Sequence, residues 1–224
     1  MCGRFTLQHS GEMLAQIFGV KVSQDIKPRY NIAPTQHVPV VRTSPEDNML
    51  HIDLLKWGLI PSWAKDTSIG SHMINARSET VDQKPSFKYS LKHRRCIAPA
   101  NGFYEWQEVD GKKHPLYIKL KDSSLMMFAG IWDHWKNPEG EVIESFSILT
   151  TSSNDLIKPL HDRMPVILDS QYKDTWLDIQ VSDPEQFKPF FKPYPSDQME
   201  MYQVGDIVNS PRNDAPECIQ PIKL

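Results

Sequence analysis

The sequence is poor in cysteine, with three in 224 residues. Cys2, Cys96 and Cys218 contain no CxxC pair, and an odd, widely spaced set does not build a disulfide framework. No apolar run approaches the roughly 20 residues of a membrane span. The N-terminus also lacks the basic and apolar regions of a signal peptide. We therefore expect a cytoplasmic protein that is not bound to a membrane.

Motifs for metals and phosphates are missing as well. His93, His114 and His134 are neither at HExxH spacing nor paired with cysteines, as metal ligands commonly are. No glycine-rich phosphate loop is present. The sequence therefore predicts no metal and no cofactor.

Charge is nearly balanced, with 25 basic and 28 acidic residues and a net charge of −3. This balance argues against bulk, non-specific coating of nucleic acid, but it leaves room for a local basic groove. No repeat, low-complexity run or linker rich in proline, glycine and serine divides the chain. We expect one domain over residues 1–224.

The hydrophobic pattern predicts many strands with helices at both ends of the chain. A helix is expected from Ser10, its cap, to Phe18, before Gly19, with Met13, Leu14 and Ile17 on the same face as Phe18. Alternating or continuous apolar runs predict strands at 37–43, 51–60, 95–100, 103–106, 116–120, 125–132, 146–150 and 199–204. The fold class is therefore α+β, as a single, largely antiparallel domain.

Shorter signals lie between these runs. Segment 27–34 is bracketed by prolines and should be an ordered loop. Asn101-Gly102 is a turn signal between two strands. Helical segments are expected at 85–91, from Asp169 through Trp176, and after Pro184.

Cys2 directly follows the initiator Met1, so removal of Met1 is chemically plausible. It would leave an α-amine with a reference pKa of about 7.7–8.0 and a thiol with one of about 8.5 on the same residue. A useful fraction of each group would then be nucleophilic near neutral pH. Such an aminothiol can condense with an aldehyde and close to a thiazolidine, or attack as a thiol with its own amine as base. Met-Cys alone also occurs by chance.

Glu105 lies within Gly102-Phe103-Tyr104-Glu105-Trp106. Aromatic neighbours tend to desolvate a carboxylate, which raises its pKa and suits it to proton transfer. Strand alternation would place Phe103 and Glu105 on one face. A solvent-facing glutamate on an edge strand fits the local sequence equally well.

Three further polar residues are candidates. His161, beside Asp162 and Arg163, could be an oriented acid–base group, although a loop histidine with satisfied hydrogen bonds is the commoner case. Asn75 could hold a carbonyl or hydroxyl group. Arg77 suits a phosphate or carboxylate.

Seven blocks occur in a fixed order along nearly the whole chain. They are MCGRF at 1–5, RYNIAPTQ at 29–36, WGLIPSWAKD at 57–66, MINARSET at 73–80, CIAPANGFYEW at 96–106, LHDRMP at 160–165 and VNSPRNDAPECIQP at 208–221. Each is weak alone, but the ordered set resembles the SOS response-associated peptidase (SRAP) family of abasic-site processing proteins. The resemblance implies a barrel-like β core with surrounding helices.

The resemblance also implies an activity. Members remove Met1, and the freed Cys2 forms a Schiff base and then a thiazolidine with the ring-opened sugar of an abasic site. The protein would thus be a cysteine-type autopeptidase and a DNA-crosslinking enzyme with lyase-like activity. Asn75 would position the amine and the sugar, Glu105 would shuttle protons, and His161 would act as acid–base on the opened sugar.

The partner implied by the resemblance is single-stranded DNA containing abasic sites, bound by a monomer. Arg4, Arg77 and Arg163 match positions expected near phosphates, and Trp63 should lie beside displaced bases. Thr150, at a strand end, is a further candidate for a backbone contact. Because Ala64 follows Trp63, the stacking surface would either be smaller or be supplied by Phe87 or Tyr89.

Two other readings remain open from the residues. An N-terminal nucleophile hydrolase acting on small amides also needs a free Cys2, together with an oxyanion hole and a small closed pocket. A non-enzymatic nucleic-acid-binding module needs no meeting of Glu105 and His161 with Cys2.

Overall fold

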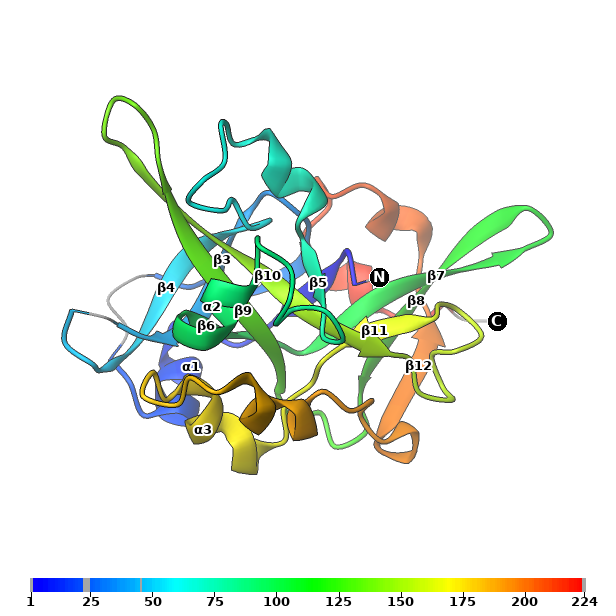
Figure 1. Cartoon of the computed structure of the whole chain (residues 1–224). Coiled ribbons are helices and arrows are strands. Elements are labelled where there is room, and N and C mark those ends of the chain that lie inside the picture. The colour runs from blue at the N-terminus through cyan, green and yellow to red at the C-terminus, as the bar shows by residue number, and fades with distance from the viewer. Residues whose placement is uncertain (1, 22–24, 45, 223–224) are drawn as a thin grey trace.

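The computed structural model describes residues 2–21, 25–44 and 46–222. Strands from two sheets form its centre, and short helices lie around them (Figure 1). Both sheets are mainly antiparallel. The predicted α+β class with a barrel-like β core is confirmed.

Five strands close into a barrel, because the pairing of the first sheet returns to its starting strand. The ring runs β10–β4–β3–β6–β9 and back to β10, and only the β10–β4 step in it is parallel. Closure leaves these strands without the free edge that an open sheet exposes. Their bounds are Val142–Ser152 (β10), Leu50–Trp57 (β4), His37–Thr43 (β3), Arg95–Ala100 (β6) and Met126–Lys136 (β9).

Two short strands extend beyond the barrel along β10. β5, Asn75–Arg77, pairs with it in parallel, and β11, Arg163–Pro165, pairs with it in antiparallel. The C-terminal end of β10 therefore brings three separate parts of the chain together.

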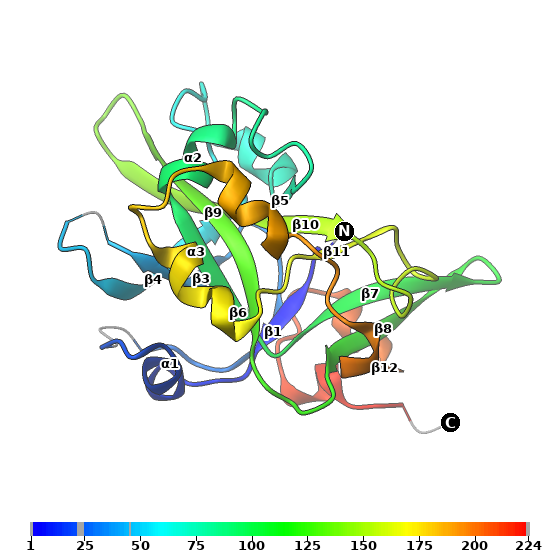
Figure 2. The same cartoon turned by 60° about the horizontal axis from the view of Figure 1, so that its bottom comes forward.

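The second sheet has the strand order β12–β8–β7–β1–β2 and is antiparallel throughout. Its strands are β12 (Met199–Gln203), β8 (Lys112–Leu120), β7 (Gly102–Val109), β1 (Phe5–Leu7) and β2 (Arg29–Ile32). Figure 2 shows β1 passing between β6 of the barrel and the β7–β8 pair. The N-terminal strand thus lies where the two sheets meet.

Aromatic packing joins β1 to the barrel. The Phe5 ring makes edge contacts with Trp57, at a centroid distance of 5.0 Å, and with Phe128, at 5.8 Å. Phe103 reaches the same Phe128 at 6.1 Å. These side chains are fully buried, and fully burying a phenylalanine contributes about 1.5–3 kcal/mol. The position of the residues just before Phe5 is therefore fixed by the core.

The helices are short and mostly as expected. α1, Gly11–Phe18, begins at the Ser10 cap and ends at Gly19 in the left-handed conformation. Its predicted apolar face is only partly buried: Leu14 and Phe18 are covered, whereas Met13 and Ile17 lie largely in solvent. Further helical segments are α2 (Lys88–His93), α3 (Lys173–Leu177) and the 3₁₀ turns of Pro184–Phe190.

One local expectation was wrong. The proline-bracketed segment 27–34 contains β2, because its backbone pairs with β1 and with the carboxylate of Asp214. Asn101-Gly102 does lie at a bend between two strands, but this bend closes no hairpin, since β6 and β7 belong to different sheets. A side chain at Gly102 would clash with the Tyr117 ring, so glycine is required there by close packing.

Candidate active site at the N-terminus

Cys2 lies at the meeting point of the sheets and is fully buried. Its carbonyl oxygen accepts a hydrogen bond of 2.9 Å from Nδ2 of Asn75. Met1, the predicted cleavage site with Cys2, lies outside the described residues. The structure thus brings Cys2 and Asn75 together across 73 positions of sequence.

β5 places Asn75 and Arg77 on one side of its backbone, because alternate residues of a strand share a face. Ile148 of β10 pairs with Asn75, and Thr150 pairs with Arg77. Arg77 is exposed. Oδ1 of Asn75 is buried and has no hydrogen-bond partner among the described residues. That oxygen can accept a hydrogen bond from a donor that enters the site.

Glu105 is buried, with 6% of its surface exposed. β7 carries it past the N-terminus, because Phe103 pairs with Phe5 and the amide of Tyr104 donates to the carbonyl of Arg4. Burial raises the pKa of Glu105 to about 7. A carboxyl group with such a pKa can both accept and release a proton near neutral pH. The reading of Glu105 as a solvent-facing residue was wrong.

The Cys2 thiol is less acidic than the reference value for cysteine suggests. Burial raises its pKa, and the negative charge of Glu105 raises that pKa further. In the folded chain, burial therefore works against a thiolate at Cys2. A nearby base must remove the thiol proton when Cys2 reacts. Glu105 lies close enough for its charge to raise the pKa of that thiol.

His161 follows the end of β10 in a loop that returns to β11. Its Nδ1 accepts a 3.0 Å hydrogen bond from the amide of Arg163 and lies 2.7 Å from a carboxylate oxygen of Asp162. Burial lowers the pKa of His161 from its usual range, which favours the neutral ring. Nδ1 faces both a donor, the Arg163 amide, and an acceptor, the Asp162 carboxylate. The proton lies on Nε2 in the tautomer that accepts from Arg163 and on Nδ1 in the tautomer that donates to Asp162.

A cavity of about 460 Å³ joins several of these side chains. Three of the predicted residues, Arg4, Glu105 and His161, line it. Its other lining residues are Trp106, Lys113, Leu160 and Asn209. Cys2 does not line this cavity but lies close to Glu105 at its wall. Glu105 and His161 thus share the cavity, and Asn75 and Glu105 both lie near Cys2.

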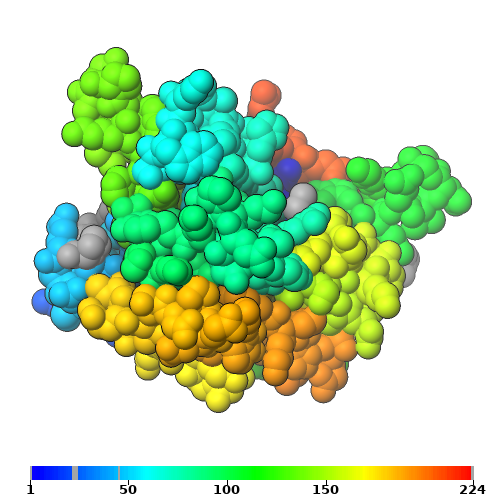
Figure 3. Space-filling view, viewed as in Figure 1, coloured from blue at the N-terminus to red at the C-terminus, as the bar shows by residue number. Residues whose placement is uncertain are grey.

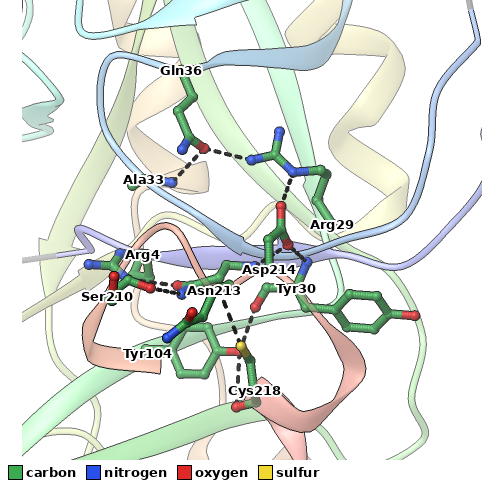
Figure 4. A network of polar contacts seen from close by, with 11 residues as sticks. Arg4, Arg29, Tyr30, Ala33, Gln36, Tyr104, Ser210, Asn213, Asp214 and Cys218 are labelled. Carbon is green, nitrogen blue, oxygen red and sulfur yellow. Dashed lines mark hydrogen bonds and ion pairs between the residues drawn. The ribbon is translucent and has the colours of Figure 1, made fainter. Parts of the chain in front are cut away.

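Arg4 is held by the C-terminal segment. Its Nη1 donates to Oδ1 of Asn31 at 2.7 Å and to the carbonyl of Val208 at 2.8 Å. Asn31 is fully buried, and its Nδ2 donates in turn to the carbonyls of Val208, Ser210 and Asn213. Figure 4 shows this network around Arg4 and Asp214. No described carboxylate forms an ion pair with Arg4, so its charge is available to an anion.

Arg163 is engaged rather than free. Its guanidinium binds both carboxylate oxygens of Glu79, at 2.6 and 2.8 Å, and donates to the carbonyl of Thr150 at 2.5 Å. Glu79 is half exposed, whereas the Arg163 side chain is largely covered. Thr150 is fully buried, and its carbonyl and hydroxyl oxygens both accept hydrogen bonds from Arg163. Thr150 thus helps to hold the Arg163 guanidinium.

Trp63 is exposed, with 59% of its surface accessible, and it projects from a loop that is fixed on both sides. The amide of Ser62 donates to Asp133, and the carbonyl of Ala64 accepts from Trp135 Nε1 at 2.7 Å. Both partners belong to β9. A large exposed ring on an anchored backbone can stack on a base without first becoming ordered.

A family model and several known proteins match nearly the whole chain. Residues 1–211 match the family model described as SOS response associated peptidase (SRAP). The chain belongs to the SRAP family. It is 44% identical over 224 residues to the abasic site processing protein YoqW of Bacillus subtilis strain 168, covering 98% of this chain and 99% of that one.

Two further proteins are similar to this chain, one in sequence and one in structure. The abasic site processing protein HMCES of Rattus norvegicus is 33% identical, over 88% of this chain and 66% of that protein. A crystal structure of a protein from Bacteroides thetaiotaomicron superposes with a TM-score of 0.90 at 28% identity, covering 99% of this chain and all of that one. The fold is therefore that of a solved protein over almost its entire length.

Sequence reasoning missed several residues that complete this SRAP site. Glu79 binds Arg163, Asn31 holds Arg4, and Asp133 anchors the Trp63 loop. Glu79 and Asn31 lie within blocks that resemble the family, but nothing in their local sequence indicates which partner they contact. Asp133 lies in a strand of apolar character and carried no signal.

No group of three or more His, Cys, Asp or Glu side chains in the described part of the chain could hold a metal ion. Among the same residues, no helix is long and apolar enough to cross a membrane.

Proposed function

We propose that this SRAP protein processes abasic sites in single-stranded DNA by forming a covalent crosslink through Cys2. The observation that carries the proposal is the convergence on Cys2 of the Asn75 amide and the buried Glu105 carboxyl group. The relatives named as abasic site processing proteins support it, since they match the chain over most of its length.

The first step is removal of Met1. A water molecule adds across the peptide bond between Met1 and Cys2, which releases methionine and leaves the α-amine on Cys2. Glu105 is the proposed base for that water, and Asn75 holds the Cys2 backbone in place. Whether the chain or an aminopeptidase carries out this step, only the product has a free aminothiol.

The second step joins Cys2 to the ring-opened sugar. The α-amine attacks the C1′ aldehyde and a water molecule leaves, which gives a Schiff base. The sulfur then adds to the same carbon, the electron pair of the C=N bond moves to nitrogen, and nitrogen gains the proton that sulfur gives up. One C–N and one C–S bond form, and a single water is released overall.

Glu105 and His161 are the proposed proton carriers. Because burial raises the pKa of the Cys2 thiol, sulfur needs a base, and Glu105 with a pKa of about 7 can serve in its ionised form. His161 shares the cavity with Glu105 and, in the tautomer that accepts from Arg163, would donate from Nε2 to the sugar oxygen as the ring opens. General acid–base groups of this kind typically contribute about 10²–10⁴-fold to a rate.

The DNA strand would lie across the arginines around the site. Arg77 is exposed, Arg4 reaches the cavity, and Arg163 binds a half-exposed carboxylate that a phosphate can replace. Arginine suits phosphate because its planar fork donates two parallel hydrogen bonds. Trp63 would stack on a base beside the abasic position, a contact worth about 1–3 kcal/mol.

The alternatives are less well supported. A small-molecule amide hydrolase would fit a closed pocket, whereas the cavity at this site carries the cationic side chains of Arg4 and Lys113, which suit a polyanion. A binding module without chemistry gives no reason for a buried carboxyl group beside an N-terminal cysteine.

Incubation of Met1-free protein with abasic single-stranded DNA, followed by a denaturing gel, tests the proposal. We expect a heat-stable shifted band with the parent protein. Cys2→Ser should give only a reversible adduct that borohydride traps, since an alcohol closes the ring far less favourably than a thiol. A heat-stable band of normal yield from protein with a blocked N-terminus would contradict it.

A further inference from the structure

A basic and aromatic face lies beside the Trp63 loop and is not used by the mechanism above. Residues 83–94 contain no acidic residue, although acidic residues outnumber basic ones in the whole chain. Their basic side chains are Lys84, Lys88, Lys92 and Arg94, with His93 between the last two. We define the α2 face as the exposed side chains of Lys84, Lys88, Tyr89, Lys92 and His93.

The lysines of the α2 face, Lys84, Lys88 and Lys92, take part in no ion pair with the carboxylates of the described residues. The acids that precede them in the chain are Glu79, which binds Arg163, and Asp82. Unpaired lysines gathered on one surface attract a polyanion.

Tyr89 gives this face an aromatic surface, with 55% of the residue exposed. Its ring lies 4.8 Å from that of His93, and the Arg94 guanidinium lies 4.9 Å from the ring centre. An exposed ring that neighbours already hold loses little freedom on binding. Interleaved aromatic and basic side chains are typical of surfaces that bind single-stranded nucleic acid.

One carboxylate connects this face to Trp63. Asp133 is buried and binds Arg94, whose guanidinium lies over Tyr89, and it also accepts the amide of Ser62 beside Trp63. Figure 3 shows that segments 60–72 and 80–93 adjoin on the face where the dark-blue start of the chain is visible. The segments that carry the two exposed rings are therefore anchored through the same carboxylate.

We propose that the α2 face and Trp63 together bind the single-stranded DNA that flanks the abasic site. The lysines contact its phosphates, and Tyr89 stacks on a base further along the strand than the one at Trp63. The inference rests on the proposed function for the identity of the strand. It adds a binding surface outside the reactive centre.

Binding to an uncrosslinkable oligonucleotide tests this surface. A strand with a central tetrahydrofuran site, lengthened on one side at a time, is titrated against the parent and Lys88→Ala/Lys92→Ala proteins by fluorescence anisotropy. Lengthening the strand on one side should tighten its binding to the parent protein, which we call the length effect. It should not tighten binding to the variant. The logarithmic salt slope should fall by about 1.4 in the variant, since each phosphate contact on a single strand contributes about 0.7.

Matched variants separate the contributions. Lys21→Ala/Lys121→Ala removes the same charge from exposed lysines of other segments and should leave the length effect intact. Tyr89→Ala should weaken binding at least about fivefold, the lower end of base stacking, whereas Tyr89→Phe should not. The affinity difference between the parent protein and Tyr89→Ala should disappear when the added nucleotides carry no bases.

The outcomes are distinct from those that test the crosslink. Crosslinking of a short abasic oligonucleotide should be equal in the parent and Lys88→Ala/Lys92→Ala proteins, because the short strand does not reach the α2 face. If the parent protein forms no crosslink but shows the length effect, the proposed function fails and the surface stands. An unchanged length effect and salt slope in Lys88→Ala/Lys92→Ala would overturn the proposal, as would selective binding of an acidic peptide at this face.

Discussion

The amide of Asn75 donates a 2.9 Å hydrogen bond to the carbonyl oxygen of Cys2. This bond ties the first residues of the chain to β5, and through β5 to the end of β10. The N-terminus is therefore held at the site from two sides, by Asn75 and by the Phe5 ring in the core. A nucleophile at a chain end needs such restraint, because termini are otherwise poorly ordered.

Asn75→Ala should slow crosslinking without unfolding the protein. A typical hydrogen bond contributes about 0.5–1.5 kcal/mol, which corresponds to a rate about 2- to 12-fold lower. The rate is measured under single-turnover conditions with abasic single-stranded DNA, and the melting temperature serves as the control. An unchanged rate would show that the bond does not orient Cys2 for reaction.

Glu105 should make stability depend on pH in a particular direction. The pKa of Glu105 is about 7 in the folded protein, whereas its ordinary value, expected for the unfolded chain, is 4.5. As pH rises, the unfolded chain therefore loses this proton at a lower pH than the folded protein does. Stability contributed by the protonated group is thus complete below about pH 4.5 and is lost as pH rises to 7. Glu105→Gln should be the more stable protein at pH 8, by up to about 3 kcal/mol.

Denaturant unfolding of both proteins between pH 4 and 8 measures this difference. The difference in unfolding free energy between the two proteins should shrink towards zero as the pH falls to 4.5. A constant difference across the range would mean that Glu105 keeps an ordinary pKa. The same variant should also lose the inflection near pH 7 in the crosslinking rate.

Glu79→Gln should tighten binding of undamaged single-stranded DNA. The carboxylate occupies both arms of the Arg163 guanidinium, and a phosphate must displace it. Removing its charge therefore frees Arg163, which Thr150 still supports through its carbonyl oxygen. In an Arg163→Ala background the same substitution should have little effect. Weaker binding by Glu79→Gln alone would instead mean that Glu79 orients Arg163.

Trp135→Phe should weaken DNA binding less than Trp63→Ala does. It removes the hydrogen bond to the carbonyl of Ala64 but leaves the exposed ring in place. The hydrogen bond is worth about 0.5–1.5 kcal/mol, of which only the part that orients Trp63 affects DNA binding, whereas Trp63→Ala loses all of the stacking, about 1–3 kcal/mol. Titrations at one salt concentration compare the two. Equal losses would show that Trp63 depends entirely on this anchor.

Much of the β core was predictable from local pattern. Strands 37–43 and 95–100 were expected with the bounds that the structure has, because short segments rich in β-branched and apolar residues favour strands. The sheet in which each strand lies was not predictable. Asn101-Gly102 shows the reason: it has the composition of a hairpin turn, but the chain passes there from one sheet to the other.

The site residues followed from family-like motifs, whereas their interactions did not. Glu105 and Asn75 carried visible signals, and the structure places both near Cys2. The raised pKa of Cys2 and the pairing of Arg163 with Glu79 depend on burial and long-range contacts. Such contacts join residues that are 70 or more positions apart and leave no trace in local sequence.

The intact mass of the heat-stable product tests the central claim most directly. The account predicts the mass of the protein without Met1, plus the abasic oligonucleotide, less one water, with the modified peptide beginning at Cys2. Peptide mapping of the same product locates the bond. A product that retains Met1, or one linked through an internal residue, would contradict the assignment of Cys2 as the nucleophile.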